Sequence, residues 1–203
     1  MHERTVLYKS ITKFAFGFLI ILININLSGF DILPDFAGYI LFISAISELS
    51  DKYKKIHLLK PLAIILLIWS VASKILSYVN FSEAVPIINL VQLTVSIVQI
   101  YFSFQLLSEI SLLVREYCEE EKPAKRLIIL RNIYTVMNTL MVSIVNIPVI
   151  TALNENQVIL WIAATLTVFT VAVAIIIAVT LFSVRKFFRE EEYSPEITEA
   201  ESE

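Results

Sequence analysis

The sequence has few of the residues that build reactive or cross-linked sites. It contains one cysteine, Cys118, so no disulfide can form within the chain. Its two histidines, His2 and His57, do not form a His-Glu-x-x-His motif, and neither a Gly-x-Ser-x-Gly nor a Gly-x-x-x-x-Gly-Lys sequence is present. An enzyme is therefore the least supported class, and we expect no catalytic residue, no cofactor and no metal site.

Charge and glycine are also scarce. Charged residues make up 17% of the chain, against about 25% in an average soluble domain. Three glycines and six prolines exclude a loop-rich or low-complexity chain, and a net charge of −3 gives no support for a nucleic-acid partner. What the chain does have is apolar residues, at 57%, with a mean hydropathy of +0.76. This balance predicts that lipid, not water, surrounds most of the protein.

Six apolar stretches are long enough, or nearly so, to cross a bilayer, which takes about 17–25 residues. A helix of a soluble bundle would show a polar stripe to water, yet residues 159–184 carry no charge on any face. Backbone groups in hydrocarbon must pair within their own segment, so each stretch is expected to be helical. The predicted fold is an all-α transmembrane bundle of three antiparallel hairpins. Its spans are 12–29, 32–49, 58–79, 85–107, 127–153 and 157–184.

The direction of the spans follows from lysine and arginine, which favour the cytoplasmic side. The connections near 28–31, 80–84 and 154–156 have neither residue, and Lys74 lies about one turn from an outer span end. The other 15 of the 16 basic residues fall in every second connection or in the two ends of the chain. This alternation predicts six spans with both termini in the cytoplasm of a bacterial-type cell membrane. Residues 1–189 form the predicted membrane domain, and the acidic tail 190–203 is expected to be disordered.

The connection between the first two spans combines Asp31, Pro34 and Asp35. Proline suits a first helical turn, and an aspartate there complements the positive end of the helix. One interpretation is a capped turn. The other is a two-carboxylate site that takes up a cation or proton, which a re-entrant second span would lower into the protein.

The same segment carries a resemblance. The stretch from Asn24 through Asp31-Ile-Leu-Pro-Asp35-Phe-Ala-Gly-Tyr-Ile-Leu, about 25 residues, resembles the signature of uncharacterised small multi-pass membrane proteins of Gram-positive bacteria. The resemblance implies a host and a membrane, and it implies no chemistry.

The fourth predicted span carries polar residues at helical spacing, which places them on one face. The interpretations are interhelical hydrogen bonds, about 0.6 kcal/mol each on average, or the wall of a polar pathway. The residues are Asn89, Gln92, Ser96, Gln99 and Ser103.

The fifth predicted span has a similar stripe, and Pro148 is expected to kink its outer end. Because spans four and five are joined by the inner loop, we expect their polar faces to oppose each other. With Asn24 and Asn26 of span one they would form an uncharged interior suited to neutral or zwitterionic ligands, or to packing alone. The stripe is Asn132, Thr135, Thr139, Ser143 and Asn146, and Asn138 of this span is a further candidate.

Two charges, Lys74 and Arg131, lie at membrane depth near span ends. Snorkelling of the long side chains toward water is the simpler interpretation. The alternative for Lys74 is pairing with Asp31 or Asp35, which lie on the same side.

The sequence leaves two functions open. One is a small-solute transport or substrate-binding subunit of the membrane, with a small polar solute or cation as ligand. The other is a non-catalytic scaffold or regulator that contacts protein partners through the 116–126 loop and the 190–203 tail.

Overall fold

The computed structural model describes residues 2–22, 26–27, 30–31, 35–50, 53–77, 85–117, 121–146 and 157–189. These residues are almost entirely helical. A short helix α3 (Lys54–His57), a 3-10 turn η1 (Arg185–Phe188) and two strands, β1 (Asn26–Leu27) and β2 (Phe30–Asp31), accompany the long helices. The long helices are α1 (His2–Leu22), α2 (Asp35–Ser50), α4 (Lys60–Ser77), α5 (Val85–Tyr117), α6 (Lys122–Asn146) and α8 (Gln157–Val184).

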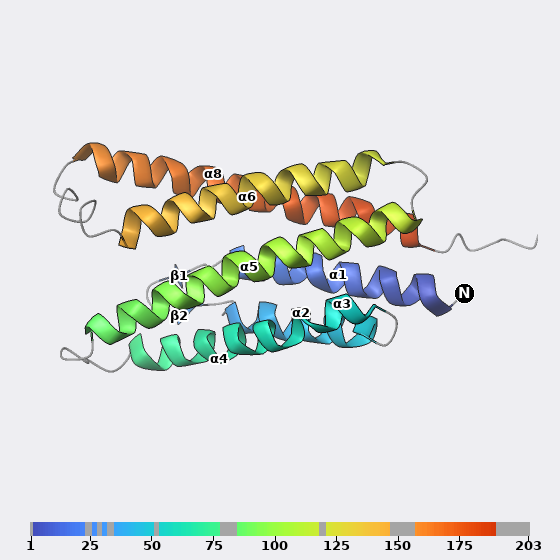
Figure 1. Ribbon diagram of the computed structural model, residues 1–203, viewed down its shortest axis with the longest axis horizontal. Helices are drawn as coiled ribbons and strands as arrows, with labels where there is room; N and C mark the ends of the chain where they lie inside the picture. The colour runs from blue at the N-terminus through green and yellow to red at the C-terminus, as the bar shows by residue number, and fades with distance from the viewer. Residues whose placement is uncertain are drawn as a thin grey trace, which may run out of the picture.

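The long helices run along one axis and alternate in direction (Figure 1). Each packs against the next one along the chain: α1 on α2, α2 on α4, α4 on α5, α5 on α6 and α6 on α8. The last helix, α8, also packs on α1. The helices therefore form a closed ring, and residues from opposite parts of the chain meet at its centre.

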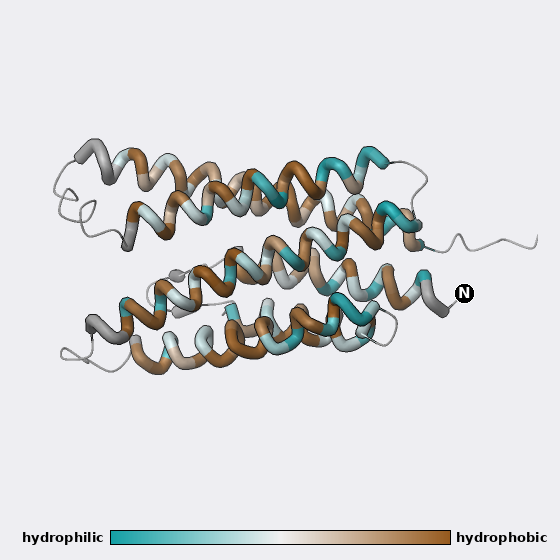
Figure 2. The backbone as a smooth tube through the Cα atoms, in the orientation of Figure 1, coloured by the Kyte–Doolittle hydropathy of each residue, from teal (hydrophilic) through white to brown (hydrophobic). Residues whose placement is uncertain are grey.

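Four helical segments are long and apolar enough to cross a membrane: Lys54–Leu76, Ile88–Tyr117, Lys122–Ile144 and Trp161–Phe188. Their outer faces carry large exposed apolar side chains, such as Trp161 and Val168. Figure 2 shows apolar residues along most of each helix, with polar ones concentrated near one end. An exposed apolar surface of this extent needs lipid around it. The protein is membrane-embedded.

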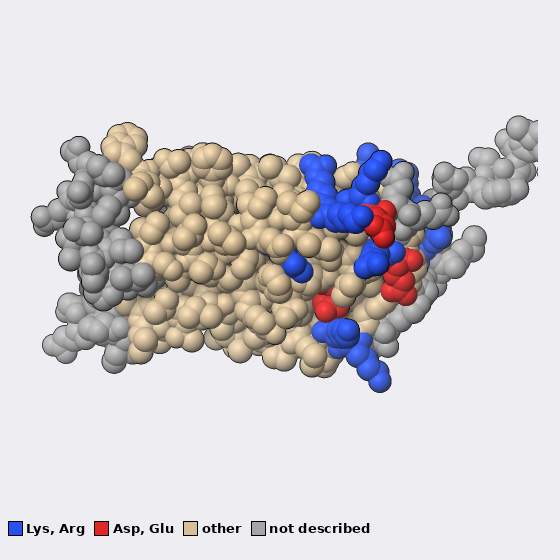
Figure 3. Space-filling model, turned by 45° about the horizontal axis from the view of Figure 1, so that its top comes forward, with Lys and Arg blue, Asp and Glu red and all other residues tan. Residues whose placement is uncertain are grey.

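On the face drawn in Figure 3, the charged residues are concentrated toward one end of the bundle, the end where α1 begins and α5 meets α6, whereas Lys74 lies in the last turn of α4 toward the opposite end. Between this basic end and the opposite end lies a broad belt of uncharged residues. The structure thus gathers basic residues that are far apart in the sequence. The number of crossings and the side that faces the cytoplasm stay predictions.

The first predicted span, 12–29, was wrong at its far end, and the helix that covers its first part starts earlier than the span. The helix begins at His2 and ends at Leu22, because basic residues are good helix formers and extend it beyond the apolar core. Residues 26–27 are instead strand β1, in which Asn26 pairs with Asp31 and Leu27 with Phe30 of β2. The sequence there contains Asn24, Asn26 and Ser28, whose side chains compete for backbone hydrogen bonds and disfavour a helix.

Helix α2, which corresponds to the second predicted span, is the shortest of the long helices. Helix α2 has 16 residues against 33 in α5 and 28 in α8. The paired strands lie level with the first half of α5 along the long axis, and α5 continues beyond them (Figure 1). The α1–α2 hairpin therefore ends inside the length of the bundle. The two acids proposed for this hinge belong to β2 and to the first residue of α2.

The loop expected at 116–126 is mostly helix. Helix α5 continues to Tyr117, and α6 begins at Lys122. Proline at position 123 is compatible with this start because the first helical turn needs no backbone N–H from it. The proposed partner-binding loop is therefore a short connection, and it is smaller than predicted. Predicted span 157–184 coincides with α8, whereas the end of span 127–153 and the tail 190–203 lie outside the described residues, as does Pro148.

Helices α1 and α2 meet at two glycines. A Cβ built on Gly17 would lie 3.1 Å from the carbonyl oxygen of Gly38. One built on Gly38 would lie 2.8 Å from the carbonyl oxygen of Gly17 and 2.6 Å from Cγ1 of Ile21. Small residues let two membrane helices approach at backbone distance. This contact holds the short hairpin together at the depth where it ends.

A polar cluster joins the same two helices near the basic end. Lys13 forms an ion pair with Glu48, and its Nζ donates a hydrogen bond to Oγ of Ser44 at 2.9 Å. Ser10 donates to the other carboxylate oxygen of Glu48 at 3.2 Å. The charge of Lys13 is thus balanced within the hairpin.

Candidate functional site

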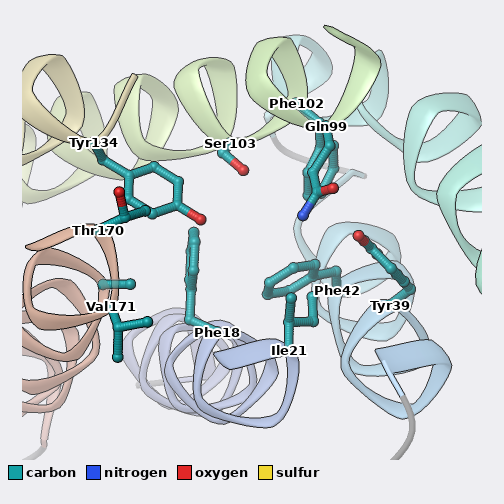
Figure 4. Close-up of a pocket in the computed structure, with 11 residues that line it drawn as sticks. Phe18, Ile21, Tyr39, Phe42, Gln99, Phe102, Ser103, Tyr134, Thr170 and Val171 are labelled. Carbon is teal, nitrogen blue, oxygen red and sulfur yellow. The ribbon is translucent and has the colours of Figure 1, made fainter. Parts of the chain in front are cut away.

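A cavity of about 190 Å³ lies at the centre of the helix ring. It is at the middle of α5, α6 and α8 and beside the inner ends of the α1–α2 hairpin, so five of the six long helices contribute to it. Figure 4 shows its side chains converging from these helices. The lining residues are Phe18, Ile21, Tyr39, Phe42, Gln99, Phe102, Ser103, Tyr134, Thr170, Val171 and Ala174.

Polar groups from three helices face this cavity. The hydroxyl of Tyr39, the amide of Gln99 and the hydroxyl of Ser103 point into it, as does the hydroxyl of Tyr134 (Figure 4). Within the described part of the chain, no side-chain hydrogen bond engages Gln99 or Ser103. A polar group away from water costs free energy unless it is paired. These groups therefore fit a bound polar molecule or a few waters.

One wall of the cavity is aromatic. Phe42 is fully buried, and its ring centroid lies 5.2 Å from that of Phe18 and 5.5 Å from that of Phe102. Phe14 and Tyr39 extend the same cluster, at 6.1 Å and 6.2 Å from Phe42. Rings in close contact give a rigid surface. The cavity wall is thus rigid and mainly aromatic on the side of the α1–α2 hairpin, and it is more polar on the α5–α6 side.

The volume limits the ligand. About 190 Å³ equals roughly six water molecules at about 30 Å³ each, below the roughly 300 Å³ at which drug-sized pockets begin. No charged residue lines the cavity. Such a space suits a small neutral or zwitterionic molecule with an apolar part and a few hydrogen-bonding groups.

The polar stripe predicted on α5 divides into two parts. Gln99 and Ser103 line the cavity, whereas Asn89 and Gln92 are exposed on the outside of the bundle. Ser96 lies between them and donates its hydroxyl to the backbone oxygen of Gln92 at 2.8 Å. Only the half of the stripe nearest the basic end faces the ring centre.

The polar stripe on α6 does not face that of α5, so the expectation that the two oppose each other was wrong. Thr135, Thr139 and Ser143 line a second hollow, a groove of about 520 Å³ between α5 and α6. Their neighbours there are a different face of α5, namely Leu93, Ile97, Ile100, Tyr101 and Phe104, together with Val142 of α6. Helical spacing assigned each stripe to one face, and it did not determine which neighbouring helix that face would contact.

The remaining amide candidates of α6 have separate positions. Asn132 is exposed and accepts hydrogen bonds from Arg131, at 3.0 Å from Nε and 2.8 Å from Nη2. Asn138 donates to the backbone oxygen of Tyr134 at 2.8 Å. The side chain of Asn146, the last residue of α6, lies outside the described residues. None of the three lines the central cavity.

The hinge candidates lie where the hairpin turns from α1 to α2, at the end away from the basic residues. Asn26 and Asp31 are directly opposite each other in the β1–β2 pair, and Asp35 starts α2 with its Oδ1 atom buried. Asn24 and the side chains of Asn26 and Asp31 lie outside the described residues. The cation site at the hinge, and its pairing with Lys74, therefore stay predictions.

Several cavity residues were missed from sequence. Tyr39 belongs to the segment quoted for its resemblance, but it was not singled out, and Phe18, Phe42 and Tyr134 look like ordinary membrane-span residues. A buried tyrosine is a usable signal, since its hydroxyl normally needs a partner. Within the described ranges, no group of three or more His, Cys, Asp or Glu residues is placed to hold a metal ion.

Comparison of the chain with known family models, curated proteins and solved structures gives no match. The functional interpretation of the site therefore depends on its geometry alone.

Proposed function

We propose that this protein binds a small neutral or zwitterionic solute in its central cavity, as the binding part of a membrane transport process. The observation that carries the proposal is the position of the cavity. It lies at mid-length of three long helices, and the groups that face it are uncharged and polar. Membrane proteins use polar interior side chains where solutes or ions pass, because such groups are costly in lipid.

In this proposal, the solute enters the cavity beside the α1–α2 hairpin. The hairpin ends inside the length of the bundle, and Ile21 and Tyr39, near that end of α1 and α2, line the cavity. Short or interrupted membrane segments commonly mark the binding site of transporters. In this proposal the tip, with Asp31 and Asp35, lies between the cavity and the non-basic side of the membrane.

The orientation of the protein, the kind of membrane and the number of spans are part of the same proposal. Basic residues concentrate at one end of the bundle, and cytoplasmic ends of membrane helices are typically enriched in them. We place that end, with both chain termini, in the cytoplasm. We also take the membrane to be a bacterial cell membrane crossed by six helices, with α1 and α2 as the short pair.

Gln99 is the residue that tests solute binding most cleanly, because the same helix offers a matched control. Gln99→Leu removes a cavity amide, whereas Gln92→Leu makes the same change two turns away, at an exposed position outside the cavity. The purified protein is heated with alanine, valine, proline or N-methylacetamide, each at a millimolar concentration too low for a general effect on protein stability. A bound solute at 100 times its dissociation constant stabilises the folded state by about 2.7 kcal/mol.

We expect one or more of these solutes to raise the melting temperature of the wild type and of Gln92→Leu, and not that of Gln99→Leu. Mass spectrometry of small molecules released from the purified protein extends the search beyond this panel. If no solute stabilises the wild type and none is released, the cavity is a packing feature. The scaffold interpretation then replaces transport.

A further inference from the structure

The groove between α5 and α6 lies on the outside of the bundle, away from the central cavity. Ile97 and Tyr101 in its wall are more than half exposed. The hydroxyls of Thr135, Thr139 and Ser143 each donate to a carbonyl of their own helix at 2.8 Å. Because these hydroxyls are already paired, the groove offers mainly methyl groups and rings, a surface suited to a hydrocarbon chain.

A cation lies at the end of this groove nearest the basic end. The guanidinium of Arg131 is 4.2 Å from the ring centroid of Phe104, which lines the groove. Its Nη1 donates to Oγ of Ser108 at 2.9 Å. The chain therefore holds this side chain against α5 instead of letting it extend to water, as snorkelling would require.

The partners of Arg131 leave its charge unbalanced. Ser108, Asn132 and the ring of Phe104 are all neutral, and no carboxylate pairs with Arg131 among the described residues. These contacts use one N–H on each of three nitrogens, out of five N–H donors in a guanidinium. Charge and hydrogen-bonding capacity thus remain for an anion.

The depth of Arg131 in the membrane indicates that its anionic partner is a lipid phosphate. It follows Lys122, the first residue of α6, by nine residues, or roughly 14 Å along the helix. Placing Lys122 at the water-facing edge of the headgroup layer, which is roughly 5–8 Å thick, puts the Arg131 backbone below the headgroups. Its side chain is then close to the boundary where lipid phosphates end and hydrocarbon begins. A charge at this depth is costly without a partner.

We propose that the α5–α6 groove binds one anionic phospholipid, with its phosphodiester on Arg131 and an acyl chain along Thr135, Thr139 and Ser143. From Arg131 to Ser143 the helix rises roughly 18 Å, close to the roughly 15 Å of hydrocarbon in one leaflet. Lys122 and Arg126 at the start of the same helix add attraction for an anionic headgroup, whereas Lys125 is already paired with Glu121. The single cation beside an apolar groove favours a lipid over a second copy of the chain.

The test uses the full chain in detergent micelles, titrated with palmitoyl-oleoyl phosphatidylglycerol and observed by native mass spectrometry. Phosphatidylcholine with the same acyl chains is the neutral comparison. We expect saturable binding of the anionic lipid, at least tenfold tighter than the neutral one. Arg131→Gln should weaken it about tenfold, and Arg131→Lys should weaken it less. Lys186→Gln, which removes an exposed charge from η1, should change it less than twofold.

A second variant tests the acyl-chain part independently. Thr139→Trp, which adds a bulky ring at an exposed position in the groove, should reduce binding of both lipids. Excess inorganic phosphate should not displace the anionic lipid, because phosphate alone does not fill the groove. Equal binding of the two lipids, or unchanged affinity in both Arg131→Gln and Thr139→Trp, overturns the proposal. So does a groove covered by a second copy, detected as a dimer that Thr139→Trp dissociates.

Discussion

Gly38→Ala lowers the melting temperature of the protein, although alanine is the better helix former by about 1 kcal/mol. The added methyl group would lie 2.8 Å from the carbonyl oxygen of Gly17, and a backbone atom cannot move aside as a side chain can. Overpacking of this kind costs about 1–3 kcal/mol. Gly38→Val is expected to lower the melting temperature further, because it adds two more carbons at the same contact.

The measurement is the unfolding midpoint in detergent, compared with Ile40→Ala. Ile40 lies two residues further along α2 and is half exposed, so its truncation should have little effect. Gly17→Ala should resemble Gly38→Ala, since its methyl group would lie 3.1 Å from the opposite carbonyl. A rise in the midpoint of Gly38→Ala, as helix propensity alone requires, would show that the two helices are not in backbone contact.

Phe42→Ala is expected to have the second large effect, because this one ring touches four others. Its centroid lies within about 6 Å of those of Phe14, Phe18, Tyr39 and Phe102. In water-soluble cores the same change costs about 3–5 kcal/mol. Lipid is as apolar as the protein interior, so only the packing part is lost, and we expect about 2 kcal/mol.

The control for Phe42→Ala is Phe169→Ala on α8, where the ring is 57% exposed on the bundle surface. We expect its unfolding midpoint to stay within about one degree of the wild type. Phe42→Ala should also weaken solute binding, because the ring forms part of the cavity wall. Equal losses of stability in the two variants would contradict the assignment of Phe42 to the centre of the ring.

The sequence predicted the helices best where apolar residues run without interruption. Span 157–184 coincides with α8 because its apolar run contains no asparagine, aspartate, glycine or proline. The prediction failed at the end of span 12–29. The apolar run continues past Leu22 there, but Asn24, Asn26 and Ser28 favour non-helical backbone conformations. Hydropathy measures the preference for lipid, and it does not measure where the helical hydrogen bonds end.

The candidate site was predicted in part. Gln99 was found because it belongs to a polar stripe at helical spacing, and it lines the cavity. The stripe on α6 was misplaced because threonine and serine satisfy their hydroxyls on their own helix. They therefore need no polar partner and can face outward. Tyr39 and Tyr134 reach the cavity from α2 and α6, which are not neighbours in the helix ring, and no local sequence pattern encodes that arrangement.

The central claim is that a polar cavity open to small solutes lies inside the membrane bundle. Its most direct test is the reaction of Ser103→Cys with methanethiosulfonate ethylammonium in membranes, in a background where Cys118 is serine. The thiolate is the reactive form, and it forms only where water or polar groups are present. Val168→Cys, exposed on the outer surface of α8, is the comparison in lipid. We expect Ser103→Cys to react at least tenfold faster than Val168→Cys, and we expect Gln99→Leu not to abolish the reaction of Ser103→Cys. Equal, slow labelling at both positions would contradict it.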